Sequence, residues 1–378
     1  MRFNLETIMS EQLINTLVRK EARQLGAYNA GLSDEAVRAR YNVDTIARLA
    51  SNENPLGASP QVITALQESA RLSAIYPDPS SQQLRDALAQ TNGVDANRVI
   101  IGNGSEDLLK LLCLAFVNPG DRVVTLLPSF GLHLIYPQMM GANVTGVPVN
   151  AQMAFDVAAW QQALQTPAKM VMFSNPSNPV GCMLDGDGFQ RLIDSSPQDC
   201  LLVIDEAYYE YCAQLDGYPD SLAVLQHQSR PWVVLRTFSK AYGLAGLRVG
   251  YGLASDPALV DILNRVRTPF NINRSAQAAA IAALHDSDHT ARSVAHVSAQ
   301  RTWLADQLTQ LRLQVVPSSA NFLFFRTAGD SAALAQRLLP FGVIVKPWLE
   351  PGYTHWIRVS VGSTVDNQRF ISALRQVL

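Results

Sequence analysis

The stretch Val233-Val234-Leu235-Arg236-Thr237-Phe238-Ser239-Lys240, followed directly by the glycine-rich run 241–250, decides the fold assignment. Its apolar residues predict a buried strand that ends at the amine of Lys240, and Arg248 stands eight positions further along. A lysine held in a dry site can form an imine with an aldehyde cofactor, while a nearby arginine holds an anion. Taken alone, a lysine at a strand end is more often a surface residue. The rest of the chain has to decide between these two interpretations.

Short apolar runs alternate with helical patterns through the first two thirds of the chain. Each run is bounded by Pro, Gly, Asn or Asp, which is typical of strands. The predicted strands are 98–101, 122–127, 143–149, 169–173, 201–204 and 232–235. Strands that alternate with helices indicate an α/β fold whose mostly parallel sheet is covered by helices on both faces. Ligands of such folds collect beyond the carboxyl ends of the strands.

The length of 378 residues predicts two domains. Near residue 265 the alternation gives way to a long helical stretch, 276–311, and then to strands near 320–325, 342–345 and 356–361. We therefore expect a large domain over 46–265 and a smaller α+β domain over 266–378. Residues 1–45 are expected to form an N-terminal helix and arm that pack with the small domain and a partner subunit.

Composition and charge exclude several classes of protein. A formal net charge of −2 with no basic stripe argues against nucleic acid as a partner. The four cysteines lie far apart, which indicates neither a disulfide framework nor a zinc site and favours the cytoplasm. The acidic N-terminus is not a secretory signal, and the longest apolar stretch, 108–117, is too short to span a membrane. His285 and His289 have a metal-like spacing, but their hydrophilic surroundings indicate a solvated surface.

Polar residues follow three of the predicted strands. Asp205 comes directly after the buried run 201–204, where it could cap a helix or keep a heteroaromatic nitrogen protonated. Tyr208 lies three residues further on, so its hydroxyl would face the same ring. The segment 174–181 contains two Asn-Pro steps that force an extended, turned backbone. Gly104-Ser105-Glu106 opens a helix after a strand, a position whose free N–H groups can receive a phosphate.

Other known motifs explain these residues less well. The chain has no phosphate-binding G-x-x-x-x-G-K-[ST] loop, and Asp107 occupies a position where a dinucleotide-binding fingerprint requires glycine. Ser239 and Lys240 are adjacent, so on an extended chain they point to opposite sides and do not form a hydrolase dyad. Arg358 alternates with the apolar residues of the predicted strand 356–361. It either faces solvent on one side of that strand, or its guanidinium binds a carboxylate or phosphate through two hydrogen bonds.

Taken together, these residues resemble the fold-type-I pyridoxal-phosphate aminotransferases, and within them the histidinol-phosphate aminotransferase branch. The resemblance runs from about Tyr28 to Gly362, and the order and spacing of its motifs carry it. The motifs are Ser51-Asn52-Glu53-Asn54-Pro55-Leu56-Gly57, Tyr76-Pro77-Asp78, Gly102-Asn103-Gly104-Ser105-Glu106, Asn175-Pro176-Ser177-Asn178-Pro179, Asp205-Glu206-Ala207-Tyr208, Ser239-Lys240, Gly246-Leu247-Arg248, Pro269-Phe270-Asn271-Ile272-Asn273, Ala320-Asn321-Phe322 and Arg358.

The resemblance implies a role for each cofactor residue. Lys240 would form the Schiff base with pyridoxal 5'-phosphate and move a proton between the substrate's Cα and the cofactor. Asp205 would pair with the pyridine nitrogen, while Tyr208 and Asn178 would bind the ring's 3-oxygen. Phe130 would stack on the ring. The residues expected at the cofactor phosphate are Gly104, Ser105, Glu106, Thr237, Ser239 and Arg248, with Tyr76 reaching in from the partner subunit of an obligate homodimer.

The resemblance also implies a substrate pocket. Arg358 would bind the substrate's acidic group, with Asn54 and Tyr28 nearby. The chain departs from the family pattern at two positions. Phe130 stands where tyrosine is common, so stacking survives and a hydroxyl is lost. Lys346 stands where the branch often has an arginine for the substrate phosphate, and lysine offers charge without the two-pronged fork.

The expected reaction is transfer of an amino group between glutamate/2-oxoglutarate and histidinol phosphate/imidazole-acetol phosphate. An aromatic amino acid aminotransferase and a decarboxylase of a phosphorylated amino acid are alternatives on the same scaffold. A non-enzymatic regulator would carry a DNA-binding module ahead of this domain, and the first 45 residues are too few and not basic enough for one.

Overall fold

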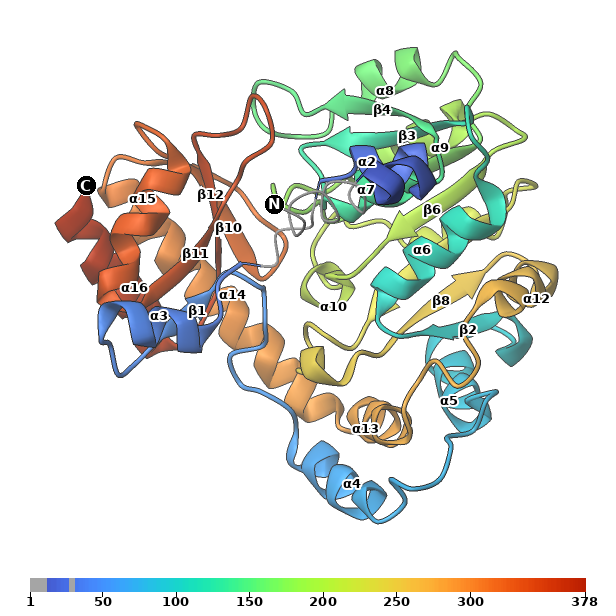
Figure 1. Ribbon diagram of the computed structural model, residues 1–378, viewed down its shortest axis with the longest axis horizontal. Helices are drawn as coiled ribbons and strands as arrows, with labels where there is room; N and C mark the ends of the chain where they lie inside the picture. Colours follow the sequence, from blue (N-terminus) through green and yellow to red (C-terminus); the bar gives the residue numbers. More distant parts are fainter. Residues whose placement is uncertain (1–11, 27–30) are drawn as a thin grey trace, which may run out of the picture.

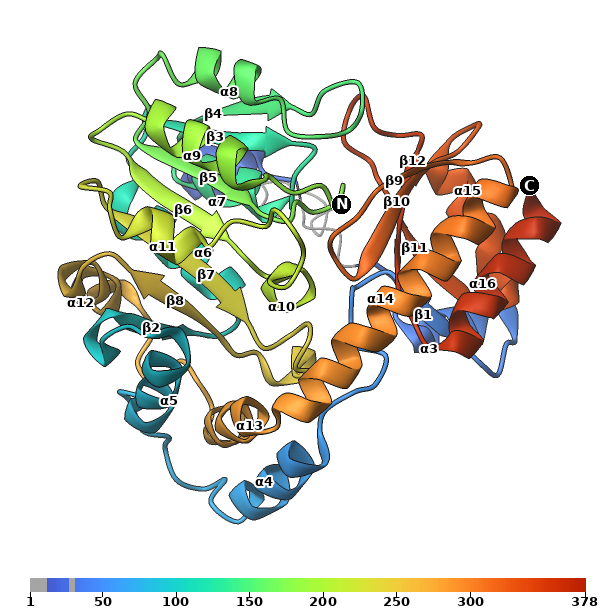
Figure 2. The same ribbon diagram turned by 180° about the vertical axis from the view of Figure 1, so that it is seen from behind.

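The computed structural model describes residues 12–26 and 31–378, in which two β-sheets are each packed against helices (Figure 1). The long helix α14 (Ser287–Gln310) runs from the region of the larger sheet to the smaller one (Figures 1 and 2). Within the described residues, no helix combines the length and the hydropathy that crossing a bilayer would require.

The larger sheet has seven strands in the order β2-β8-β7-β6-β5-β3-β4. Only β8 runs against its neighbours β2 and β7; all other pairs are parallel. The strands are β2 (Val99–Gly102), β3 (Arg122–Leu127), β4 (Asn143–Pro148), β5 (Met170–Ser174), β6 (Leu201–Asp205), β7 (Trp232–Thr237) and β8 (Gly250–Ala254). The carboxyl ends of β5, β6 and β7 therefore meet at one edge of the sheet.

Helices cover both faces of this sheet, so its strands carry apolar residues on both sides. In β5, Met170 and Met172 pack with the cluster that includes α6 and α12, whereas Val171 and Phe173 pack with α8 and α9 on the opposite face. Figures 1 and 2 show the two helical layers from opposite sides. The helices of this part are α4 (Pro60–Ala70), α5 (Gln82–Asn92), α6 (Ser105–Phe116), α7 (Leu132–Met139), α8 (Val157–Ala163), α9 (Gly186–Ser195), α10 (Tyr209–Cys212), α11 (Ser221–Leu225), α12 (Pro257–Val266) and α13 (Arg274–His285).

The smaller sheet has five strands in the order β1-β11-β12-β10-β9. Its apolar side chains pack with α14, α15 and α16 in a core of their own, which contains Phe322, Phe325 and Phe370. The elements are α3 (Asp34–Tyr41), which precedes the sheet, and β1 (Ala47–Leu49), β9 (Gln314–Val316), β10 (Phe322–Arg326), α15 (Ser331–Leu338), β11 (Val343–Pro347), β12 (Trp356–Ser360) and α16 (Thr364–Val377). Helix α2 (Lys20–Gln24) instead contacts α7 on the larger sheet (Figure 1).

The structure confirms an α/β fold with a mixed, mostly parallel sheet and the six strands predicted for it. The predicted domain limits differ from the observed packing at two places. Residues 47–49, assigned to the large domain, pair with β11 in the smaller sheet, and α13, assigned to the small domain, packs against α4 and α5. A strand of three residues is too short to show a periodic pattern, and a helix pattern does not reveal which sheet it covers.

Candidate active site

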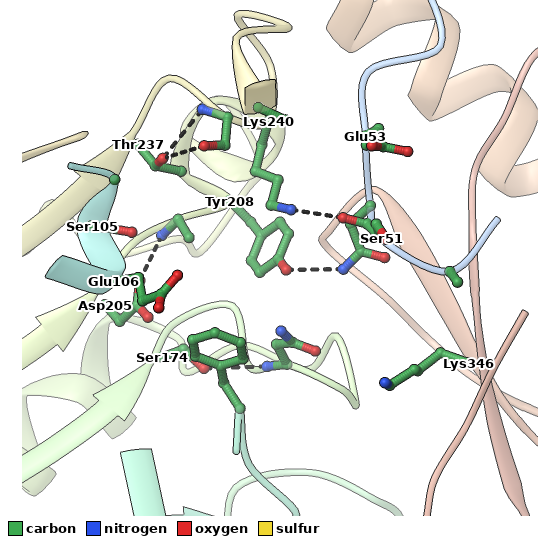
Figure 3. Close-up of a pocket in the computed structure, with 18 of the residues that line it drawn as sticks. Ser51, Glu53, Ser105, Glu106, Ser174, Asp205, Tyr208, Thr237, Lys240 and Lys346 are labelled. Carbon is green, nitrogen blue, oxygen red and sulfur yellow. Dashed lines mark hydrogen bonds between the residues drawn. The ribbon is translucent and has the colours of Figure 1, made fainter. Parts of the chain in front are cut away.

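A pocket of about 310 Å³ lies where the carboxyl ends of β5, β6 and β7 face the smaller sheet. Ser105, Glu106 and Asp205 lie on one side of it, Ser51, Glu53 and Lys346 lie on the other, and Lys240 and Tyr208 extend between them (Figure 3). The described lining residues are Arg48, Ala50, Ser51, Asn52, Glu53, Gly104, Ser105, Glu106, Phe130, Ser174, Asn178, Asp205, Ala207, Tyr208, Thr237, Ser239, Lys240, Ala245, Arg248, Lys346 and Arg358.

Lys240 follows β7 and places its amine inside this pocket. Its Nζ donates a hydrogen bond to the backbone oxygen of Ser51 over 2.9 Å and lies 6.0 Å from the centre of the Tyr208 ring. Burial, and after it the positive charge of Arg358, lowers the pKa of the Lys240 amine to about 7. A large share of this amine is therefore neutral near pH 7, the form that attacks a carbonyl carbon or takes up a proton.

One end of the pocket is built to hold an anion. Helix α6 begins at Ser105, directly after Gly104, whose φ of +82° is unfavourable for other residues. A Cβ at Gly104 would lie 2.5 Å from Nη2 of Arg248, so the glycine is what allows the guanidinium to approach the helix N-terminus. Thr237 and Ser239 add hydroxyl groups that lie 3.1 Å apart. Backbone N–H groups at a helix start, two hydroxyls and an arginine are a donor set suited to a phosphate.

A buried carboxylate, that of Asp205, lies on the same side of the pocket as Ser105 and is 4% exposed. Its Oδ2 lies 3.1 Å from Nε2 of His133, and the other ring nitrogen of His133 lies 3.1 Å from the hydroxyl of Ser129. Its Oδ1 accepts a hydrogen bond from the backbone N–H of Ala207. These partners fix the carboxylate in one orientation. His133 was not predicted, because its partner lies 72 positions away and no local pattern marks it.

Aromatic and amide side chains also line the pocket. The hydroxyl of Tyr208 accepts a hydrogen bond of 2.9 Å from the side-chain amide of Asn52. Phe130 lines the pocket and contacts the ring of His133 edge-on, with 5.7 Å between ring centres. The side-chain oxygen of Asn178 accepts a hydrogen bond of 2.6 Å from Arg358. A flat ring placed here would meet aromatic faces and a hydroxyl.

Two cations lie next to each other on the smaller sheet. Arg358 is 7% exposed and also donates to the backbone oxygen of Ala50, so it is not the solvent-facing residue that strand alternation allowed. Lys346 is its direct partner across β11 and β12. Burial, and after it the charge of Arg358, lowers the pKa of the Lys346 amine to about 8. Like charges directly opposite each other on a sheet are destabilising, which favours an anion bound between them.

Two predicted site residues, Asn54 and Tyr76, are not among the described residues that line this pocket. The side chain of Asn54 is buried and donates to the backbone oxygen of Ala241 and the hydroxyl of Ser293, so it braces the backbone beside Lys240. Tyr76 is 76% exposed and stacks on Phe270, with ring centres 4.6 Å apart, so its role in a partner's site stays a prediction. Tyr28 lies outside the described residues.

The described residues offer no cluster of three or more side chains suited to a metal ion. His289, interpreted from sequence as a solvated surface residue, is instead buried and contacts the backbone oxygen of Gly57 through Nε2. The site chemistry fits a different ligand. An anion cradle, a fixed carboxylate and a reactive amine beside aromatic rings match a flat, phosphorylated heteroaromatic aldehyde with a basic ring nitrogen.

Comparison with known proteins gives consistent results. Residues 44–374 match the family model described as aminotransferase class I and II. The chain is 47% identical to histidinol-phosphate aminotransferase 1 of Mesorhizobium japonicum, covering 96% of this chain and 98% of the relative. It is 46% identical to histidinol-phosphate aminotransferase 3 of Rhizobium meliloti, covering 95% and 97%. The crystal structure of histidinol-phosphate aminotransferase from Sinorhizobium meliloti in complex with pyridoxal-5'-phosphate superposes with a TM-score of 0.87 at 28% identity, covering 96% of this chain and 97% of that one.

Proposed function

The chain belongs to the class I and II aminotransferase family, and from this premise we propose that it is a pyridoxal-phosphate-dependent histidinol-phosphate aminotransferase. It would move an amino group between glutamate/2-oxoglutarate and histidinol phosphate/imidazole-acetol phosphate. The observation that carries the proposal is the Lys240 amine of lowered pKa, which shares one pocket with an anion cradle and the Asp205 carboxylate. The names of the relatives support the choice of substrate.

The residues of the pocket would hold the cofactor in one orientation. The N-terminus of α6, Thr237, Ser239 and Arg248 would bind its phosphate, and Asp205 would face its ring nitrogen. Phe130 would pack on the ring, while Tyr208 and Asn178 would bind its phenolic oxygen. When bound, pyridoxal phosphate supplies an aldehyde that accepts amino groups and a ring that takes up electron density.

The chain's own residues would then bind the substrate and move its proton. Arg358 and Lys346 would hold the substrate's phosphate, and in the other half-reaction Arg358 would hold a carboxylate of glutamate. Lys240 Nζ would take the proton from the substrate's Cα, a task for which a general base needs a pKa near the working pH. The carboxylate of Asp205, fixed by His133, would keep a proton on the facing ring nitrogen.

The proposal is tested by comparing substrates on the purified protein loaded with pyridoxal phosphate. We expect kcat/KM for histidinol phosphate with 2-oxoglutarate to exceed that for phenylalanine by roughly tenfold or more, because only histidinol phosphate brings a phosphate to the two cations. Equal or better use of phenylalanine would instead favour an aromatic aminotransferase. Release of carbon dioxide from a phosphorylated amino acid would favour a decarboxylase.

The pH dependence of histidinol phosphate use should report on Lys346. Above its pKa of about 8 the Lys346 amine loses its proton, and with it the charge that attracts the phosphate. We therefore expect kcat/KM for histidinol phosphate to fall as the pH rises from 8 to 10, because kcat/KM follows the ionisation of the free enzyme. In the variant Lys346→Arg this fall should disappear, since arginine keeps its charge throughout that range.

Steady-state kinetics of wild type, Lys346→Arg and Lys346→Met at several pH values would measure this effect. At pH 7, Lys346→Met should lose roughly tenfold in kcat/KM, the order expected for one charge-assisted contact. An unchanged pH profile in Lys346→Arg, together with full activity in Lys346→Met, would show that the substrate phosphate binds elsewhere.

A homodimer with shared active sites and a cytoplasmic location complete the proposal. Both come from the resemblance and the composition. The dimer is supported by the exposed Tyr76–Phe270 stack, which leaves aromatic surface for a second chain to cover.

A further inference from the structure

A second hollow, of about 320 Å³, opens beside the candidate active site. The two share the side chains of Phe130, Lys346 and Arg358, so a ligand bound at these cations can extend into either space. The hollow lies between the start of α7 and the segment that follows β11. Its described lining residues are Ser129, Phe130, Gly131, Leu134, Ile135, Gln138, Lys346, Pro347, Trp348, Leu349, Glu350 and Arg358.

The walls of this hollow suit a ring. Leu134 and Ile135 come from α7, Pro347 ends β11 and Trp348 follows it, so much of the lining is apolar or aromatic. Phe130 stands at the junction with the active site. Pockets of this size and character commonly take one flat group and fix its orientation with a few polar atoms.

Glu350 is the one acidic side chain among the described residues that line the hollow. It is half-buried, and its Oε2 accepts hydrogen bonds from the indole N–H of Trp348 over 3.1 Å and from the backbone N–H of Ser129 over 3.4 Å. Burial raises the pKa of this carboxyl above its usual value. Removing a carboxylate from water is costly unless donors compensate it, and both donors here reach the same oxygen. A ligand that brings a further N–H donor would be favoured over one that does not.

We propose that this hollow is the ring subsite for an N–H-bearing heteroaromatic substrate, with Glu350 as the residue that selects the ring by accepting its N–H. The inference rests on the proposed function, which names histidinol phosphate as the substrate. With the phosphate held by Lys346 and Arg358, the imidazole of that molecule can enter the adjoining hollow and donate to the carboxylate. A phenyl ring of similar width fills the same space but leaves the carboxylate without the extra donor, so it is selected against.

A purely structural role for Glu350 makes a different prediction. In that case the residue only ties the segment after β11 to Ser129 and Trp348. The substitution Glu350→Gln separates the two roles, because the glutamine side-chain oxygen can still accept both hydrogen bonds while the negative charge is lost. The substitution Glu350→Leu removes the acceptor altogether. It also replaces the carboxylate with an apolar side chain, which favours binding of an apolar ring.

The two half-reactions of the holoenzyme provide the test. We expect Glu350→Gln to lower kcat/KM for histidinol phosphate by roughly tenfold, which corresponds to about 1.4 kcal/mol. Turnover of glutamate, which has no ring to place in the hollow, should change by less than about twofold. Glu350→Leu should lose more with histidinol phosphate and gain with phenylalanine, so the ratio of the two kcat/KM values should fall by roughly a hundredfold.

A binding measurement adds a readout that does not depend on turnover. In a Lys240→Ala background, calorimetric titration with histidinol phosphate should show a Kd roughly tenfold weaker when Glu350 is replaced by glutamine. Glu35→Gln, which neutralises an exposed acid on α3, serves as the matched control and should leave both kinetics and Kd unchanged.

Each result has a defined meaning. A loss confined to histidinol phosphate supports the ring subsite. Unchanged kcat/KM and Kd in Glu350→Gln would overturn it, as would an equal loss in both half-reactions, which would assign Glu350 a structural role only. If the wild-type enzyme does not use histidinol phosphate at all, the proposed function itself fails, and that result is visible before any variant is made.

Discussion

Replacing Lys240 with alanine is expected to reduce transamination by about 10⁴-fold or more, because the change removes both the nucleophilic amine and the general base. The amine lies inside the pocket, bonded to the backbone oxygen of Ser51, and its pKa is lowered to about 7. Within the described residues, the other lysine lining this pocket is Lys346. It lies on the smaller sheet, and we propose that it binds the substrate's phosphate. Lys240→Ala should still bind pyridoxal phosphate through the anion cradle and Asp205.

Activity and attachment can be measured separately in this variant. Rates of both half-reactions would give the loss of turnover. Mass spectrometry after borohydride reduction should show a covalent adduct in the wild type and none in Lys240→Ala. Lys169→Ala, which removes an exposed lysine just before β5, is the matched control and should behave like the wild type. Near-normal turnover by Lys240→Ala would refute the assignment of this residue.

Replacing Arg236 with leucine is expected to lower the free energy of unfolding by about 3–5 kcal/mol. The guanidinium is 4% exposed and makes two contacts of 2.8 Å with Oε2 of Glu206, itself 1% exposed. It also donates to the side chain of Asn92 over 2.7 Å and lies 3.4 Å from the centre of the Tyr209 ring. Losing the arginine would leave a buried carboxylate without its cation. The expected loss is a large part of the total free energy of unfolding of an ordinary protein.

Urea unfolding would measure this effect, and a double variant would identify its cause. Glu206→Gln combined with Arg236→Leu should be more stable than Arg236→Leu alone, because the uncompensated charge is then gone. Arg326→Leu at the exposed end of β10 should change stability by less than about 0.5 kcal/mol. A loss below about 1 kcal/mol for Arg236→Leu would mean that the Glu206 carboxylate is stabilised by its other donors, Tyr218 and Ser221.

Strands with an apolar pattern were predicted, and those rich in glycine were not. The six strands from β2 to β7 read as apolar runs because both faces of their sheet are covered. β8 was missed, since Gly250 and Gly252 weaken a strand pattern. Contacts explain both glycines. A Cβ at Gly250 would lie 2.3 Å from the backbone N of Ser105, and one at Gly252 would lie 3.1 Å from the side chain of Ile100.

The candidate active site was predictable to the extent that its residues follow strands. Asp205 ends β6, and Asn178 and Lys240 follow the neighbouring strands β5 and β7, so their meeting at one edge follows from topology. His133 and Asn52 were missed because each acts on a residue more than 70 positions away, Asp205 and Tyr208 respectively. Asn54 belongs to a motif of the family, yet it braces the backbone instead of lining the pocket.

By itself, the sequence determined the α/β class, the strand-end positions of the reactive side chains and the kind of cofactor they suit, because periodicity and residue chemistry are local properties. The tertiary structure decided what depends on distance and on exclusion of water. It brought Lys346 beside Arg358, and it brought the Glu350 carboxylate within hydrogen-bond distance of the Ser129 N–H. The hollow that these residues line is built from segments more than 200 positions apart. It also lowered the pKa of the Lys240 amine, since burial by surrounding segments, rather than neighbouring residues in the chain, sets that value.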